Sequence, residues 1–397
     1  MTAIVALLLW LCALPAIIPL TVILIELIAG LLPLKQVFQD AAEHPQTVVL
    51  MPAHNEASII SDTVQKVQND LPPQCRLLVV ADNCSDDTAR LARDAGAAVV
   101  ERSSAMLRGK GHALAFGGDS LVSDPPDYIV ILDADCLPAP KSIEHLVRAA
   151  QGSGRPVQAS YCFTAPSSAN PVVKISNFAF YVKNVVRQRG MSRMGDVCLL
   201  TGAGMAFSWP QYRKAAVASG VIVEDLAMGL DLMKAGHPPL FLEDALITSD
   251  AATAKDTVGQ RQRWEHGYLS TMFREALPCI AQGLVTMDRA LLWTGLHLLV
   301  PPLALLVMIS STIALLQALA TTLGQSATPF LIITMQLSLL MLLLAVCWLR
   351  GGKAYANASA LARLPFYMLW KIPIYLRLLT NRQREWNRTP RGGKDDS

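Results

Sequence analysis

The chain has 397 residues, of which 52% are hydrophobic and only 16% are charged, so part of its apolar surface must face lipid. A net charge of +3 is too small to indicate nucleic-acid binding, and we predict no nucleic-acid partner. The 8 cysteines include no Cys-x-x-Cys pair, which argues against a zinc site and a disulfide framework. Reduced thiols fit a cytosolic location for the water-soluble part of the chain.

The N-terminal 34 residues are apolar almost throughout, and we interpret residues 1–34 as an uncleaved transmembrane helix. A cleaved signal peptide is the alternative. It is disfavoured because no basic segment follows Met1 and because the apolar run is longer than the core of a signal peptide.

Residues 45–272 have ordinary globular composition, in which short apolar runs alternate with helical segments. The runs rich in Val, Leu and Ile, which predict strands, are Thr47–Met51, Arg76–Ala81, Ala97–Glu101 and Tyr128–Leu132. The segments that predict helices are Ala57–Asn69, Asp86–Ala95 and Gly111–Leu121. This alternation is typical of an α/β fold with a mainly parallel sheet, in which ligands bind beyond the carboxyl ends of the strands.

Polar loops follow the first two predicted strands. The first strand leads into Pro52, His54, Asn55 and Glu56, and the second leads into Asp82. Loops rich in carboxylates and amides suit a ligand that carries hydroxyl groups, a base with N–H groups and a metal-bound phosphate.

The fourth predicted strand leads into Asp133 and Asp135, which lie two residues apart and can turn both carboxylates toward one ligand. Such a pair can hold Mg²⁺ or Mn²⁺ together with substrate phosphates; the alternative is a capping turn before a helix near Pro140. Lys110 opens a predicted helix after a basic loop, where it either contacts phosphate or is simply solvated. Its surroundings lack the spacing of a P-loop.

Two later segments also combine groups that suit catalysis. Glu224 and Asp225 precede a predicted helix, where they either cap it or act as a general base that takes the proton of a hydroxyl nucleophile. Gln260, Arg263 and Trp264 place an amide, a guanidinium and an indole within five residues. Together these groups can donate hydrogen bonds, neutralise a diphosphate and stack on a sugar.

The C-terminal part returns to apolar composition. We predict an interfacial linker helix at 273–289, two transmembrane helices within 290–349, and an interfacial helix with a basic tail at 354–397. The two spans are expected at about Ala290–Leu319, with a kink at Pro301-Pro302, and at Pro329–Leu349. Leu361–Leu379 is the expected interfacial helix, with a fourth span as the alternative.

Positive charges flank the spans on one side only. Lys35, Arg289, Arg350 and Lys353 lie at matching ends, whereas Thr321–Thr328 carries no charge. The positive-inside rule therefore places the soluble domain in the cytosol, and we expect an integral protein of the bacterial inner membrane.

In this order, the motifs Pro-Ala-His-Asn-Glu, Asp-Ala-Asp, Glu-Asp and Gln-Arg-Gln-Arg-Trp, with Asp82 and Lys110 between them, resemble those of family 2 glycosyltransferases. The likeness covers about Thr47 to Met272. It is to the membrane-bound branch that includes cellulose, hyaluronan and poly-N-acetylglucosamine synthases and ceramide glucosyltransferases. Gly202-Ala203-Gly204 matches a loop of the family, and Val223 departs from it, since Thr usually precedes the Glu-Asp pair.

The resemblance implies a GT-A fold and a role for each motif residue. It implies donor binding by Pro52, His54, Asn55, Glu56, Asp82, Lys110, Asp133 and Arg263, and acceptor binding by Gly202, Ala203, Gln260 and Trp264. It also implies a divalent metal, Mg²⁺ or Mn²⁺, on Asp135 and Asp133, and catalysis by Asp225 with Glu224.

The reaction implied is an inverting transfer of a hexose or N-acetylhexosamine from a nucleotide-sugar, UDP by family likeness, to a lipid-linked, lipid or saccharide acceptor. Polysaccharide or glycolipid biosynthesis would be its setting. A processive synthase that works with a partner or as a homo-oligomeric pore is one alternative. An inactive membrane scaffold or transport subunit is another. A transport subunit predicts several polar residues inside the spans, yet only Glu26 and His297 are ionisable within the expected spans.

Overall fold

The computed structural model describes residues 2–36, 45–215, 223–251 and 254–380, and the chain folds as two compact units. The sheet unit comprises Pro33–Ser168 and Asp196–Gly267, and the helical unit comprises Met1–Leu32, Ala169–Gly195 and Tyr268–Arg382. Ala169–Gly195 thus belongs to the helical unit although it falls within the expected domain at 45–272.

The sheet unit is built on eight strands in the order β3-β2-β1-β4-β7-β6-β8-β5. Its parallel part consists of β1 (Thr47–Ala53), β2 (Cys75–Asp82), β3 (Ala98–Arg102) and β4 (Tyr128–Ile131). The remainder is mixed and consists of β5 (Cys136–Pro138), β6 (Val157–Thr164), β7 (Met205–Ser208) and β8 (Leu240–Asp250). The carboxyl ends of β1 to β4 therefore lie at one edge, which is where the sequence places its polar loops.

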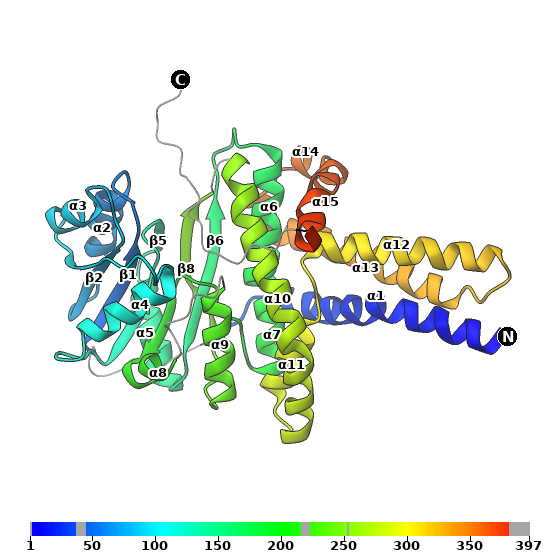
Figure 1. Cartoon of the computed structure of the whole chain (residues 1–397), viewed down its shortest axis with the longest axis horizontal. Coiled ribbons are helices and arrows are strands. Elements are labelled where there is room, and N and C mark those ends of the chain that lie inside the picture. The colour runs from blue at the N-terminus through cyan, green and yellow to red at the C-terminus, as the bar shows by residue number, and fades with distance from the viewer. Residues whose placement is uncertain (1, 37–44, 216–222, 252–253, 381–397) are drawn as a thin grey trace. The chain divides into compact units, whose positions relative to one another are not determined.

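Helices connect and cover these strands (Figure 1). They are α2 (Ile60–Asn69), α3 (Thr88–Asp94), α4 (Lys110–Ser120), α5 (Ser142–Ser153), α8 (Trp209–Lys214) and α9 (Glu224–Lys234). The spacing of Ile60, Val64 and Val67 explains how α2 packs, because residues at i, i+4 and i+7 share one face, and all three are buried. Leu50 of β1 and Leu114 of α4 are completely buried in a common core, where each such side chain contributes about 2 kcal/mol.

The expected α/β architecture is confirmed, and the four strands predicted from the sequence agree with β1 to β4 within two residues at each end. The agreement has a physical cause. The strands β1, β2 and β4 are largely buried and are nearly continuous apolar runs, which are visible in a sequence, and the more exposed β3 still begins with the apolar residues Ala98, Val99 and Val100.

The helical unit contains α1 (Thr2–Gly30), α6 (Pro171–Tyr181), a π-helical turn η1 (Val182–Val186) and α7 (Arg187–Gly195). It continues with the part of α10 (Ala254–Thr286) that follows Gly267, and with α11 (Arg289–Leu298), α12 (Leu303–Thr322) and α13 (Thr328–Arg350). The short η2 (Gly352–Ala354), α14 (Ala358–Leu361) and α15 (Leu364–Thr380) complete it. Three helices among the described residues are long and apolar enough to cross a membrane: Ile4–Gly30, Leu303–Thr322 and Thr328–Arg350.

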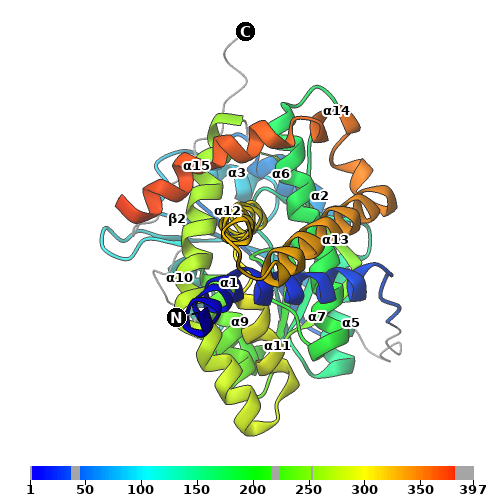
Figure 2. The ribbon, with the colours of Figure 1, turned by 90° about the vertical axis from the view of Figure 1, so that its right-hand side faces the viewer.

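The helix expected from Ala290 to Leu319 is divided in the structure. Here α11 ends at Leu298 and α12 begins at Leu303, because Pro301 and Pro302 lack the N–H groups that would continue the helical hydrogen bonds. The Tyr268 hydroxyl lies 3.2 and 3.0 Å from the carbonyl oxygens of His297 and Val300, so its single proton is shared between two acceptors that the break leaves open. Figure 2 looks nearly along α12 and shows α11 and α15 lengthwise, so both run across the direction of the span.

The ionisable residues noted within the expected spans form a buried cluster in the helical unit. Glu26 accepts from Arg187 Nε at 2.6 Å and lies 2.7 Å from His297 Nδ1. All three side chains are less than 10% exposed. Gly190 makes this possible, since a Cβ atom there would lie 2.3 Å from the Glu26 carbonyl oxygen and would separate α7 from α1. The cluster accounts for these charges as a contact between helices, because a buried charge needs a partner.

Candidate active site

The loops that follow β1 and β2 are joined into one rim. His54 Nδ1 lies 2.6 Å from the carbonyl oxygen of Asp82, and Asn55 Oδ1 accepts from the backbone N–H of Ser85 at 2.7 Å. The backbone N–H of Glu56 donates to Thr88 Oγ1 at 2.8 Å. The structure therefore brings His54, Asn55, Glu56 and Asp82 together. Pro52 differs from the expectation, since it lies within β1 rather than in the loop.

Asp82 has a partner that the sequence analysis missed. Arg102, the last residue of β3, donates from Nη1 to Asp82 Oδ1 at 2.5 Å, and both side chains are 9% exposed. The parallel register pairs Asp82 with Arg102 directly. Extending the predicted strand Ala97–Glu101 by one residue would have placed Arg102 at the carboxyl end of a strand, but the register that pairs it with Asp82 comes only from the fold.

Lys110, the first residue of α4, connects three segments of the site. Its Nζ lies 2.5 Å from Asp133 Oδ1, 2.7 Å from the Gly202 carbonyl oxygen and 4.0 Å from Glu224 Oε1. Burial alone would lower the pKa of Lys110, but the carboxylates of Asp133 and Glu224 outweigh burial and raise that pKa. Lys110 is therefore a fixed cation, and the alternative of a solvated loop residue is wrong.

The loop at Gly202 leaves room between this cation and Asp225. Gly202 has a φ of +95°, which disfavours other residues, and a Cβ atom there would lie 3.3 Å from Asp225 Oδ2. Ala203, the other expected acceptor residue of the loop, is fully buried, and its carbonyl accepts from Gln158 Nε2 at 2.9 Å. It supports the loop from within.

Glu224 and Asp225 open α9 without capping it. The N-cap is Val223, which makes no side-chain cap hydrogen bond, and Asp225 Oδ1 accepts from the N–H of the next residue, Leu226, at 2.8 Å. Burial, assisted by the charge of Asp225, raises the pKa of Glu224 to about 7 against the opposing effect of Lys110. A carboxyl group with a pKa near neutrality beside a second carboxylate is typical of sites that move protons.

Asp133 and Asp135 lie between β4 and β5, and a short strand rather than a helix follows them. Their carboxylate oxygens and the Cys136 sulfur all lie within 4.8 Å of one another. Ser249 Oγ donates to Asp135 Oδ2 at 3.0 Å and orients that carboxylate, a contact that the sequence does not reveal because β8 pairs with β5 only in the fold. Burial raises the pKa of the Cys136 thiol well above its usual range, so the carboxylates are the donors that suit Mg²⁺ or Mn²⁺.

The Gln-Arg-Gln-Arg-Trp segment lies on α10. Trp264 stacks on Phe163 of β6 with ring centroids 6.1 Å apart, and the Arg261 guanidinium lies 5.3 and 5.0 Å from the centroids of Phe163 and Trp264. Arg261 was missed by the sequence analysis. Burial lowers the pKa of Arg263, and the nearby Glu224 carboxylate opposes this shift, so Arg263 lies close enough to Glu224 to interact with its charge. The side chain of Gln260 lies outside the described residues.

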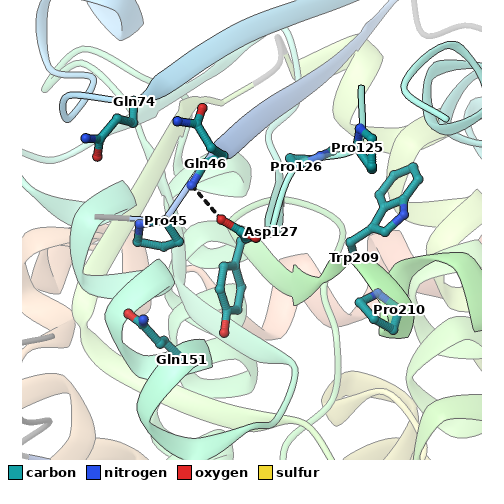
Figure 3. Close-up of a pocket in the computed structure, with 10 residues that line it drawn as sticks. Pro45, Gln46, Gln74, Pro125, Pro126, Asp127, Gln151, Trp209 and Pro210 are labelled. Atoms are coloured by element: carbon teal, nitrogen blue, oxygen red, sulfur yellow. Dashed lines mark hydrogen bonds between the residues drawn. The ribbon is translucent and has the colours of Figure 1, made fainter. Parts of the chain in front are cut away.

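A pocket of about 1090 Å³ lies at the opposite edge of the sheet, near the amino ends of β1, β2 and β4 (Figure 3). Residues such as Pro126 and Trp209 line it, and Asp127 Oδ2 accepts from the Gln46 N–H at 2.9 Å. None of the predicted site residues lines this pocket. The candidate active site is therefore the group of polar side chains at the carboxyl edge.

The mixed α/β sheet, with paired carboxylates, a buried lysine and an acidic helix start near the carboxyl ends of its parallel strands, has the fold of the GT-A glycosyltransferases. A solved structure with this fold is the mannosyltransferase PcManGT from Pyrobaculum calidifontis, in complex with GDP-Man and Mn²⁺, which superposes with a TM-score of 0.52 at 17% identity. The match covers 88% of this chain and 99% of that chain. Glucosyl-3-phosphoglycerate synthase from Mycobacterium tuberculosis, solved with Mn²⁺ and UDP-glucose, matches with a TM-score of 0.40 at 19% identity over 60% of this chain and 87% of its own.

The chain belongs to the family described as glycosyltransferase like family 2, whose model matches residues 44–267. A curated relative, Protein RfbJ of Shigella flexneri, is 30% identical over 105 residues, which cover 25% of this chain and 75% of that protein. The resemblance seen in the sequence is confirmed, and the protein is a glycosyltransferase.

The raised pKa of Glu224 predicts a pH-dependent cost in stability. Because this pKa is about 7 in the folded state and 4.5 otherwise, the folded state keeps a proton that the unfolded state has released between these values. The stability that this proton gives the folded state is fully present below about pH 4.5 and is lost as the pH rises through about 7. Glu224→Gln should therefore gain melting temperature over the wild type at about pH 8 and gain less at about pH 5.

Melting of the ligand-free protein in detergent at both pH values measures this effect. Glu101→Gln, which removes an exposed carboxylate paired with Arg93, serves as the control and should give the same difference at both values. An equal difference for Glu224→Gln at the two pH values would show that its carboxyl group titrates normally.

The position of Asp135 predicts loss of metal binding on substitution. Asp135→Asn should weaken Mn²⁺ binding at least ~10-fold while leaving the melting temperature nearly unchanged, because the change removes a charged ligand without opening a cavity. Electron paramagnetic resonance of Mn²⁺ titrated into the protein measures affinity directly. Asp127→Asn, at the opposite edge of the sheet, is the matched control. Full transferase activity in excess EDTA would contradict a metal site here.

Proposed function

We propose that the protein transfers a sugar from a nucleotide-sugar, with inversion, to a lipid or lipid-linked acceptor at the cytosolic face of the bacterial inner membrane. The observation that carries this proposal is the position of Asp225 at the Gly202 loop, beside the Lys110 cation and the Asp133–Asp135 pair. A base, a cation and a metal-binding pair are the groups that a displacement at an anomeric carbon requires. The mannosyltransferase with the same fold binds GDP-Man and Mn²⁺, which supports the class of donor.

Each residue of the site has a separate role in the transfer of the sugar. The acceptor hydroxyl oxygen attacks the anomeric carbon while Asp225 takes its proton, and the bond from that carbon to the diphosphate oxygen breaks. Lys110 and Arg263 stabilise the charge of the departing nucleoside diphosphate, and Trp264 provides a stacking surface for a sugar. A divalent cation on Asp133 and Asp135 would supply further neutralisation of the diphosphate.

Asp225→Asn should reduce kcat at least ~10²-fold with little change in the KM of the donor, because a general base acts only as the acceptor proton is removed. Initial rates at saturating acceptor measure both constants. Asp231→Asn, an exposed carboxylate on the same helix, should retain wild-type rates. Weakened donor binding at unchanged kcat would instead make Asp225 a ligand of the nucleotide.

The spans favour a short product over a long polymer. A chain that threads its own glycan needs a polar path sheltered from lipid. In the helical unit, Gln317 and Gln336, both less than 10% exposed, donate to the backbone carbonyls of Leu9 and Ile17 at 2.7 and 3.3 Å. These amides join α12 and α13 to α1 and do not line an open path. We therefore propose that one or a few sugars are added.

Purified protein in liposomes, given a panel of radiolabelled nucleotide-sugars and a lipid extract, should yield label in a small, lipid-extractable product. Separation of the products by size measures this outcome and identifies the sugar. Long polymer inside the vesicles, made without a partner, would support the processive alternative. Absence of transfer and of donor hydrolysis with every nucleotide-sugar would support an inactive scaffold.

The orientation rests on Lys35, Arg350 and Lys353, which flank the first and third candidate spans, and on Arg289, which precedes the second span with α11 between them. A reporter fused after Ser397 should report a cytosolic location, and a reporter inserted between Thr321 and Thr328 should report the opposite side. An external signal from the C-terminal fusion would refute both the orientation and the number of spans.

A further inference from the structure

The buried ion pair of Asp82 and Arg102 stands out in the sheet unit. Most ion pairs described in this unit are exposed. An example is the pair of Arg93 on α3 and Glu101, the residue before Arg102 on β3, whose side chains are 48% and 58% exposed. Asp82 and Arg102 are each only 9% exposed. Exposed pairs contribute little to stability, whereas the two partners of a buried pair depend on each other, because removal of either one leaves an uncompensated buried charge.

Arg102 also holds the loop that leads to Lys110. Its Nη2 donates to the carbonyl oxygen of Leu107 at 2.7 Å, while its Nη1 is bound to Asp82. Asn83 Oδ1 accepts from the N–H of Ser104 at 2.7 Å, and Ser104 Oγ accepts from the N–H of Leu107 at 3.1 Å. One guanidinium thus connects the end of β2 to residues 103–109, and Lys110 follows directly.

The pair leaves Asp82 with one carboxylate oxygen for a ligand. Oδ1 accepts from both Arg102 and Asn83 Nδ2, the latter at 3.0 Å, while no hydrogen bond from a described residue reaches Oδ2. An ionised carboxylate can only accept hydrogen bonds. Uracil and guanine carry a ring N–H between their polar substituents and can donate to such an oxygen. Cytosine and adenine present a ring nitrogen acceptor at that position, which an acceptor-only partner repels.

We propose that Arg102 is a positioning and specificity residue, which fixes Asp82 as an acceptor for nucleobases with a ring N–H and links occupation of the base site to the Lys110 loop. The inference rests on the proposed function in one respect, that the rim containing Asp82 binds the donor. It extends that function by excluding cytidine and adenosine donors and by assigning a residue that no motif contains.

Calorimetric titration with UDP, GDP, CDP and ADP in the presence of Mn²⁺ tests the proposal. The wild type should bind UDP or GDP at least ~10-fold more tightly than CDP and ADP, since mismatched polar groups in a site are strongly rejected. Arg102→Gln should bind the preferred nucleotide ~10-fold more weakly. The difference in affinity between that nucleotide and CDP or ADP should also become smaller. Arg102→Lys keeps the positive charge but lacks the two separate N–H groups that reach Asp82 and Leu107. Its nucleotide affinity and its preference should lie between those of the wild type and those of Arg102→Gln. Arg93→Gln is the matched control and should bind as the wild type does.

The outcomes separate this inference from the proposed function. A folded Arg102→Gln variant with unchanged affinities and preference, or a wild type that prefers CDP or ADP, would overturn the role of Arg102 and leave glycosyl transfer intact. Should Arg102→Gln melt at a much lower temperature, Arg102→Lys and Asp82→Asn decide the question, since each must still narrow the preference. A wild type that binds none of the four nucleotides and transfers no sugar would overturn the proposed function as well.

Discussion

The ammonium group of Lys110 is the interaction on which the candidate site depends. It lies within hydrogen-bonding distance of Asp133 and of the Gly202 carbonyl oxygen, and near Glu224, so it joins the end of β4, the loop before β7 and the start of α9. Carboxylates held this close would repel one another in a site of low dielectric constant without a cation between them. The geometry of the acidic groups is thus a consequence of one buried positive charge.

The acidic groups nevertheless exceed the cations around them. Asp133, Glu224 and Asp225 act on Lys110, Asp135 lies beside Asp133, and Arg263 is near Glu224. The pKa of Glu224 is raised chiefly by burial, and the neighbouring charges of Asp225 and Asp133 add to that shift. A site in this condition is prepared for a divalent cation, which compensates the charge that a diphosphate would add. Metal and donor are therefore expected to depend on each other for binding, a coupling that follows from electrostatics.

The helical unit also contains polar groups that are paired with one another in its interior. Glu26, Arg187 and His297 satisfy one another in its interior, and the amides of Gln317 and Gln336 bind backbone carbonyls of α1. Polar groups in an apolar environment must be paired within the protein, because lipid offers no partners. These contacts account for Glu26, Arg187 and His297 and for the amide nitrogens of Gln317 and Gln336. The side-chain oxygens of both glutamines and the Ser310 hydroxyl have no hydrogen-bond partner among the described residues.

The sequence by itself determined the parallel strands, the three apolar spans and the order of the motifs, because these depend on local composition and on periods of two and 3.6 residues. It did not determine that α11 separates from α12, since a Pro-Pro pair is compatible with a kink or a break. Only the tertiary structure decided which residues serve the motifs. Arg102 reaches Asp82 through a parallel register, and Ser249 reaches Asp135 through an antiparallel one. Strand pairing joins residues distant in sequence, and no local pattern records it.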